Sequence, residues 1–126
     1  MHTHAVIVHY EDTDLSGFVY HANYLKFIER ARSDWVRHLG IDQNALRASG
    51  LVFAVHRIEA DFLAPARLDD RLTVTTTPVA RTPARLVLDQ RIQRGDTPLF
   101  AAKVTLVAMS TDGRPRRLPP CLKETD

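Results

Sequence analysis

Two periods of hydrophobic residues divide the chain into segments expected to form strands and segments expected to form helices. From Thr3 to Tyr10 the side chains alternate between two largely apolar sets, which predicts a strand buried on both faces. From about Tyr24 to Leu39 the period becomes that of an amphipathic helix, with Asn23 as candidate N-cap and Gly40 as candidate stop. The predicted apolar stripe of this helix consists of Tyr24, Phe27, Ile28, Ala31, Trp35 and Leu39.

The remainder of the chain predicts one short helix followed by strands. The short helix runs from about Gln43 to Ala48, with Asp42 as its cap, and ends at Gly50. Alternating residues then predict strands that are separated by proline, glycine and aspartate turn signals. These strands centre on Ile58 to Phe62, Leu72 to Val79, Arg85 to Ile92 and Leu99 to Met109, and a polar tail follows Asp112-Gly113.

This order of elements predicts a single α+β domain over residues 1–126, in which about the last ten residues form a polar tail. The connections between the last three strands are too short for crossover helices, so those strands are expected to pair antiparallel. The long helix has one apolar stripe and should pack on one face of a sheet of about five strands. A homodimer that extends the sheet would cover an otherwise unpaired edge.

Composition and charge narrow the class of protein. Hydrophobic residues make up 44% of the chain and charged residues 25%, as in soluble globular proteins. Seventeen basic residues against fifteen acidic ones give a net charge of +2, too small to indicate a nucleic acid partner. No stretch predicts a signal peptide or a transmembrane segment, and the single cysteine, Cys121, cannot form an intrachain disulfide. We therefore expect a cytoplasmic protein.

Candidate chemistry is concentrated just before the long helix. Asp12 and Asp14 precede His21. Gly17 lies between Asp14 and His21, where it allows the backbone to turn sharply. A carboxylate near the start of a helix combines a reactive oxygen with backbone N–H groups that can stabilise an oxyanion. Spacing alone leaves open the alternative that both aspartates only form the turn.

The motif around these residues resembles a known family. Tyr-x-Asp-Thr-Asp-x-x-Gly-x-Val-Tyr-His-Ala-Asn-Tyr, followed by Phe-x-Glu-Arg-Ala-Arg, spans Tyr10 to Arg32. It resembles the signature of the 4-hydroxybenzoyl-CoA thioesterase-like hotdog superfamily, and is closest to the acyl-CoA thioesterase branch associated with the bacterial Tol-Pal system. The segments from Ala64 to Asp70 and from Arg114 to Pro119 also resemble that branch, so the similarity covers nearly the whole chain.

The resemblance implies an acyl-CoA thioesterase with the hotdog fold, in which a long central helix is wrapped by an antiparallel sheet. It implies that Asp14 is the catalytic carboxylate and that Tyr10 and His21 accompany it. It further implies a homodimer, commonly a dimer of dimers, with active sites at the subunit interface. No cofactor is expected.

Thioester hydrolysis assigns roles to these residues. The backbone N–H of His21 is the first candidate for the oxyanion donor, and Asp14 would either attack the carbonyl or activate water. The sequence leaves both routes open. It also leaves open whether the His21 side chain takes part, and whether Tyr10 contacts the carboxylate, lines the acyl pocket or packs in the core. Asp12 is expected to shape the turn and Asn23 to cap the helix.

Other features carry weaker expectations. Arg81 and Arg85 flank a turn and are candidates for binding the phosphates of CoA. His2, His4 and His9 lack acidic or cysteine neighbours, so we expect no metal site. An alternative function is an acyl-CoA or acyl-carrier-protein binding module without hydrolysis. Hydration or dehydration of an acyl thioester is less favoured, because Glu29 and Asp34 fall on the polar side of the helix.

Overall fold

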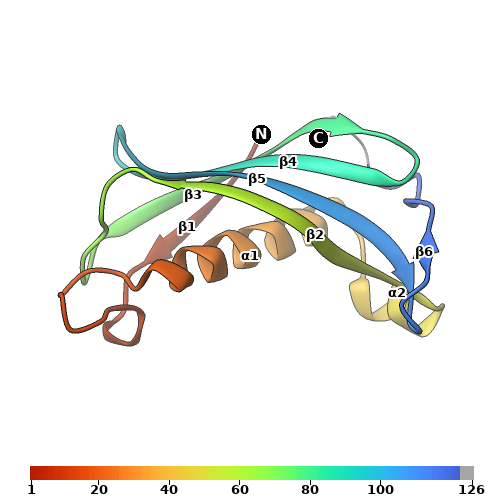
Figure 1. Cartoon of the computed structure of the whole chain (residues 1–126), viewed down its shortest axis with the longest axis horizontal. Coiled ribbons are helices and arrows are strands. Elements are labelled where there is room, and N and C mark those ends of the chain that lie inside the picture. The colour runs from red at the N-terminus through yellow and green to blue at the C-terminus, as the bar shows by residue number, and fades with distance from the viewer. Residues whose placement is uncertain (123–126) are drawn as a thin grey trace.

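A computed structural model describes residues 1–122 and shows one long helix held against a curved antiparallel sheet (Figure 1). The helices are η1 (Tyr10–Asp12), α1 (His21–His38) and α2 (Gln43–Ala48). The strands are β1 (His2–Ile7), β2 (Leu51–Phe62), β3 (Arg71–Arg81), β4 (Arg85–Arg94), β5 (Thr97–Ser110) and β6 (Pro115–Arg116). Among these residues, no helix is both long and apolar enough to cross a membrane.

The strands follow the order β1-β3-β4-β5-β2, with the short β6 added beside β5, and every pairing is antiparallel. The predicted antiparallel pairing of the last strands is therefore confirmed. β2 lies at one edge of the main path and β1 at the other. The first of these edges is 12 residues long and bears a bulge at His56, between paired Val55 and Arg57.

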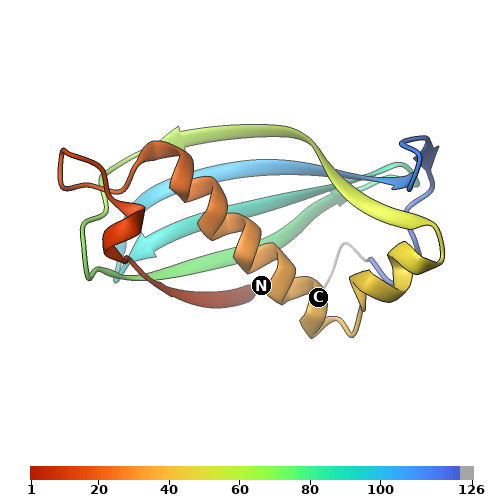
Figure 2. The same cartoon turned by 90° about the horizontal axis from the view of Figure 1, so that it is seen from below.

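Helix α1 crosses the inner face of the sheet diagonally (Figure 2). Its first residue lies near the end of β2, where the rings of His21 and Phe62 have centroids 6.4 Å apart. Towards its C-terminal end it lies beside β1, where His2 Nε2 is 2.7 Å from Asp34 Oδ2. α1 therefore approaches β2 at one end and diverges from it at the other.

The core forms between α1 and the inner face of the sheet. The predicted helical stripe is buried, apart from Leu39, which is only partly buried. Tyr24 stacks on Phe100 with ring centroids 5.5 Å apart. Such pairs contribute about 0.5–1.5 kcal/mol beyond the area they bury. The fully buried side chains of the helix include Phe27, Ile28 and Trp35.

The first strand differs from the expectation, whereas the second helix does not. β1 ends at Ile7 and is an edge strand, with Val6 buried and Ile7 43% exposed, so the prediction of burial on both faces is wrong. The alternation was correct, but the chain leaves the sheet early and turns through η1. The second helix is confirmed with its predicted cap, because Asp42 Oδ1 accepts from the N–H groups of Asn44 and Ala45.

The C-terminal segment packs against the far end of the sheet. β6 pairs with β5, and Leu118 and Leu122 are buried, although this segment reads as largely polar. Arg81 fixes the segment, because its Nε donates to the carbonyl oxygen of Leu122 and its Nη2 to that of Pro119. The rest of the predicted tail, residues 123–126, lies outside the described residues.

Candidate active site

Asp14 is placed by a tight turn that precedes α1. The N–H of Gly17 donates to the carbonyl oxygen of Asp14, and the N–H of Asp14 donates to that of Phe18, each at 3.0 Å. Gly17 has φ +85°, a left-handed conformation that strongly favours glycine. The turn therefore needs glycine at this position, and it presents the Asp14 carboxylate on the surface.

The Asp14 carboxylate accepts two hydrogen bonds from one neighbour. Its Oδ1 accepts from the backbone N–H of Ser16 at 2.8 Å and from the Ser16 hydroxyl. These bonds, the hydroxyl first, lower the pKa of Asp14 below its ordinary value of 3.8, and the nearby His21 adds a smaller effect in the same direction. Asp14 is therefore ionised near neutral pH. Ser16 was not among the predicted site residues, although a serine two residues after an aspartate is a common turn pattern.

Asp12 faces inward and organises the loop. It is 5% exposed, and its carboxylate accepts from the N–H of His9 at 2.9 Å. Its carbonyl oxygen accepts from the N–H of Tyr20 and from Asn23 Nδ2, both at 2.9 Å. The expectation that Asp12 shapes the turn is confirmed, and the two acids of the motif have different environments.

The start of α1 differs from the expected one. The helix begins at His21 and its N-cap is Tyr20, so the prediction that Asn23 caps the helix is wrong. Asn23 lies one turn inside and ties the helix to Asp12 instead. The backbone N–H of Tyr20 donates to the same carbonyl oxygen, and the Tyr20 carbonyl oxygen accepts from the N–H of Asn23. The Tyr20 side chain makes no cap, and among the described residues the N–H groups of His21 and Ala22 have no partner.

The backbone N–H of His21 is one of these free donors. It makes no hydrogen bond within residues 1–122, and it lies at the positive end of an 18-residue helix. The His21 side chain is exposed, and its ring contacts Tyr20 at a centroid distance of 4.5 Å.

An aromatic wall adjoins this helix start. Phe62, at the end of β2, is 53% exposed and has its ring 5.6 Å from Tyr24 and 5.2 Å from Phe100. The Tyr24 hydroxyl accepts from the N–H of Ala66. This bond fixes the segment that follows β2 beside residues 13–20, which we call the motif loop. A partly open apolar surface therefore lies next to the carboxylate and the free amide.

Tyr10 takes a different position from the one a core residue would have. It opens η1 and is 82% exposed, so the core alternative is wrong. Among the described residues its hydroxyl makes no hydrogen bond to Asp14. In one copy of the chain, Asp14 and His21 therefore lie at the two ends of the short loop that precedes α1, and Tyr10 is left in solvent.

The two candidate phosphate-binding arginines lie at the other end of the sheet. Arg81 ends β3 and Arg85 begins β4, whereas the motif loop lies beside the start of β3 at Arg71 (Figure 1). β3 is 11 residues long, so its two ends are roughly 30 Å apart. Arg81 is engaged by the C-terminal segment, while Arg85 is exposed and lines a hollow of about 280 Å³ with His56, Arg57 and Lys103. Neither contacts Asp14 of the same chain.

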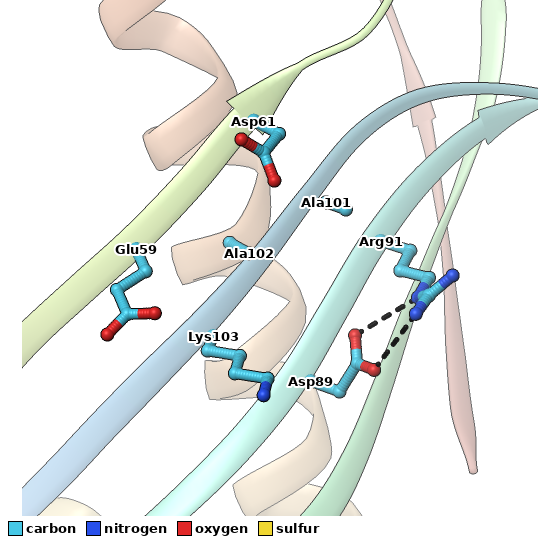
Figure 3. A pocket seen from close by; sticks show the side chains of 7 residues that line it. All are labelled: Glu59, Asp61, Asp89, Arg91, Ala101, Ala102 and Lys103. Atoms are coloured by element: carbon cyan, nitrogen blue, oxygen red, sulfur yellow. Dashed lines mark hydrogen bonds and ion pairs between the residues drawn. The ribbon is translucent and has the colours of Figure 1, made fainter.

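The outer face of the sheet bears a second, shallow hollow of about 200 Å³ (Figure 3). Its charged side chains point away from α1, and Arg91 binds both carboxylate oxygens of Asp89, at 3.2 and 3.3 Å. This bond raises the pKa of Arg91. Lys103 pairs in register with Glu59 on one side and Asp89 on the other. The charges that line this hollow therefore largely compensate one another, and none of its lining residues is singled out as a reactive group.

The N-terminal histidines contact an acid of the helix. His2 Nε2 lies 2.7 Å and His4 Nδ1 3.5 Å from Asp34 Oδ2, and the hydrogen bond from His2 lowers the pKa of Asp34. Within residues 1–122, no three histidine, cysteine or acidic side chains are placed to hold a metal ion. We read the contact as one that ties β1 to α1.

Comparison with known proteins gives one consistent family. The model of the thioesterase superfamily matches residues 16–101. The chain is 41% identical over 116 residues to the acyl-CoA thioester hydrolase YbgC of Escherichia coli, covering 90% of this chain and 87% of that protein. It is 39% identical over 105 residues to the acyl-CoA thioesterase YbgC of Haemophilus influenzae, covering 82% and 77%. The crystal structure of a probable thioesterase from Bartonella henselae superposes with a TM-score of 0.89 at 41% identity, covering 94% and 98%.

Proposed function

The chain belongs to the thioesterase superfamily, with the hotdog fold, and from this premise we propose that it hydrolyses acyl-CoA to a free acid and CoA with Asp14 as the reacting carboxylate. One observation supports Asp14 most directly. It is an ionised, exposed carboxylate seven positions before a helix whose first N–H, that of His21, has no partner among the described residues. The buried Asp12, held by the loop, is not available for the same role.

Two routes are compatible with this site. In the first, an Asp14 oxygen attacks the thioester carbon, the C–S bond breaks, CoA leaves as a thiolate, and water then hydrolyses the mixed anhydride. In the second, Asp14 takes a proton from a water molecule whose oxygen attacks the same carbon. The thiolate is a good leaving group in both, so no strong general acid is required.

The backbone N–H of His21 would stabilise the oxyanion that forms in either route. One such donor contributes about 3 kcal/mol to transition-state stabilisation in a well-studied protease. The positive end of α1 adds to this effect, because the helix dipole favours negative charge at its N-terminus. The aromatic wall formed by Phe62 and Tyr24 would receive the first part of the acyl group.

Replacement of Asp14 tests the proposal. Asp14→Asn keeps the size of the side chain but removes the charge, and we expect a loss of about 10²–10⁴ in kcat, measured as thiol release from acyl-CoA. Glu11→Gln, another exposed acid of the loop, is the matched control and should retain activity. Circular dichroism would verify the fold of both variants. Turnover by Asp14→Asn close to that of the wild type would contradict the role given to Asp14.

The same assay separates hydrolysis from simple binding. A panel of acyl-CoAs of increasing chain length is offered to the wild-type chain, and binding is measured in parallel. Saturable binding without thiol release for any chain length would favour an acyl-CoA or acyl-carrier-protein binding module.

We also propose that Arg85 of one copy of the chain binds the phosphates of a CoA whose thioester lies at Asp14 of a second copy. Arg85 is exposed, next to Arg57 and Lys103, and lies too far from Asp14 of its own chain to serve that site. Arg81 would act indirectly, since its guanidinium holds the C-terminal segment. Arg85→Ala should raise KM for acyl-CoA and leave KM unchanged for an acyl phosphopantetheine, which lacks the nucleotide. An equal change for both substrates would contradict this assignment.

A homodimer is the expected working unit. β2 leaves one edge of the sheet without a partner strand in residues 1–122, and exposed apolar side chains cluster beside Asp14, including Leu15, Tyr20 and Phe62. A second copy would cover both features, and pairing of two dimers would give a tetramer. Sedimentation equilibrium tests this proposal, because a mass of one chain at enzyme concentrations that show turnover would contradict it.

A further inference from the structure

A hollow of about 300 Å³ lies between α1 and the first half of β2, away from the motif loop. It occupies the region where helix and strand diverge (Figure 2). Its wall is mixed, with apolar side chains on the β2 side and polar ones, two of them charged, on the helix side. The lining includes Glu29, Arg32, Ser33 and Val36 of α1 and Phe53 and Val55 of β2.

Arg32 is held rigidly at the edge of this hollow by a buried amide. Its Nη1 donates to Oε1 of Gln90 at 3.0 Å, and Gln90 is fully buried in β4. Gln90 Nε2 in turn donates to the carbonyl oxygen of Ile28 at 3.0 Å and to the Thr76 hydroxyl at 2.9 Å. All hydrogen-bonding atoms of the amide are therefore engaged, which fixes both its orientation and the position of the guanidinium.

The guanidinium retains unused donors. A guanidinium has five N–H groups, and in the described residues Arg32 uses one hydrogen bond and forms no ion pair. Burial lowers the pKa of Arg32, while Glu29 one turn earlier opposes that effect. Glu29 lines the same hollow and is likewise without an ion pair among residues 1–122. A donor and an acceptor thus face one space that apolar side chains of β2 also line.

The hollow and the proposed oxyanion donor lie on the same side of α1. His21, Leu25, Glu29, Arg32 and Val36 follow one another at spacings of three or four residues and so share one side of α1. Arg32 follows His21 by 11 positions, which is about 16 Å along the helix axis, and its side chain leans back towards the helix start. β2 runs next to this side of α1, with Phe62 near His21 and Phe53 at the hollow.

We infer that the hollow receives the distal part of the acyl group, and that Arg32 and Glu29 together select a hydroxyl group there. This inference rests on the proposed thioesterase function and adds a substrate class to it. A thioester whose carbonyl oxygen is bound by the His21 amide would direct its acyl chain along this side of α1, next to β2. A chain of about ten carbons has the length needed to reach the guanidinium over this span.

A hydroxyl group matches the pair better than the alternatives. Its oxygen accepts from Arg32 and its proton is donated to Glu29, so both charged groups regain a hydrogen bond when water leaves the hollow. A terminal methyl group would leave the partly buried Arg32 without a further partner, which is costly for a polar group that loses water. A terminal carboxylate would bind Arg32 but would be repelled by Glu29.

The test compares three acyl-CoAs of equal chain length: decanoyl-CoA, 10-hydroxydecanoyl-CoA and the CoA monothioester of decanedioic acid. For the wild type we expect kcat/KM to be about tenfold or more higher for the hydroxylated substrate than for the alkyl one, as for a hydrogen bond to a charged group. Arg32→Met should reduce this ratio to about one, because the hydroxylated substrate then loses its advantage over decanoyl-CoA. Arg30→Met, an exposed arginine of the same helix, is the matched control and should keep the wild-type ratio.

A second variant tests the inference independently of the Gln90 bond. Glu29→Gln removes the repulsive charge at an exposed position, so its kcat/KM for the dicarboxylic substrate should rise relative to decanoyl-CoA. A wild-type ratio near one, or an equal effect of Arg32→Met on both substrates, would overturn the inference while hydrolysis itself stood. A wild-type chain that releases thiol from none of the three would overturn the proposed function and this inference with it.

Discussion

The role of the His21 amide can be separated from that of the His21 side chain by two substitutions at one position. His21→Ala removes the imidazole and keeps the N–H, whereas His21→Pro removes both. Proline is tolerated at this position for two structural reasons. His21 is the first residue of α1, where proline is favoured and no helical hydrogen bond is lost. Tyr20 before it has φ −61° and ψ 133°, the extended conformation that a residue before proline requires.

The expected magnitudes differ strongly. Loss of one oxyanion donor lowers kcat by about 10²–10³, or about 2.7–4 kcal/mol, and His21→Pro should show this loss relative to His21→Ala. The cost to stability should be small, because the N–H has no partner in the folded chain among the described residues. His21→Ala itself should change the rate by less than about tenfold if the imidazole acts only through its charge near Asp14.

Thiol release from one acyl-CoA at saturation measures kcat for the three proteins, and thermal unfolding followed by circular dichroism measures their stability. Similar melting temperatures with a large loss for His21→Pro alone would support the amide as the donor. If His21→Pro were as active as His21→Ala, the oxyanion would be stabilised elsewhere. If His21→Ala lost as much as His21→Pro, the imidazole would be the essential group.

Three further outcomes are expected. Ser16→Ala removes the strongest contribution to the lowered pKa of Asp14, so the pKa should rise towards 3.8 and the acidic limb of the kcat/KM profile should move to higher pH, because the ionised form is the active one; an unmoved limb would contradict this. Gln90→Leu removes three hydrogen bonds and should lower the free energy of unfolding by about 2–4 kcal/mol in urea denaturation. Trp35→Ala should cost about 3–5 kcal/mol. Trp35→Phe should cost less than about 1.5 kcal/mol, because the buried indole N–H has no partner in the described residues.

The periodic parts of the fold could be predicted from the sequence because burial imposes a period on it. The stripe of α1 from Tyr24 to Trp35 is buried as expected, and the aspartate cap of α2 follows from its local chemistry. β1 was assigned too much burial because alternation reports two faces but not what covers them. Its true position at a sheet edge depends on pairing with β3, more than 60 residues away. The hydrophobic pattern of one segment does not contain that pairing.

The start of α1 was missed for a related reason. His21, Ala22 and Asn23 interrupt the apolar period, so the pattern begins at Tyr24, while the helix begins where the backbone of Tyr20 is held by the carbonyl oxygen of Asp12. The helix start is therefore positioned by a tertiary bond and has no side-chain cap. The first amide, that of His21, stays available to another acceptor, because a capping side chain accepts only from the second or third amide of a helix.

Arg32 shows which part of a site a sequence does not disclose. It lies between the apolar and polar sides of α1, where a charged residue usually extends into solvent. Its importance arises from Gln90, which is 58 positions away in a strand that otherwise alternates regularly. An amide on the apolar face of that strand is a local exception, and buried polar side chains need partners to be stable. The partner that satisfies its oxygen is a cation at the edge of a hollow. A lone amide among the buried positions of a strand therefore directs the search for a site to whatever faces it across the core.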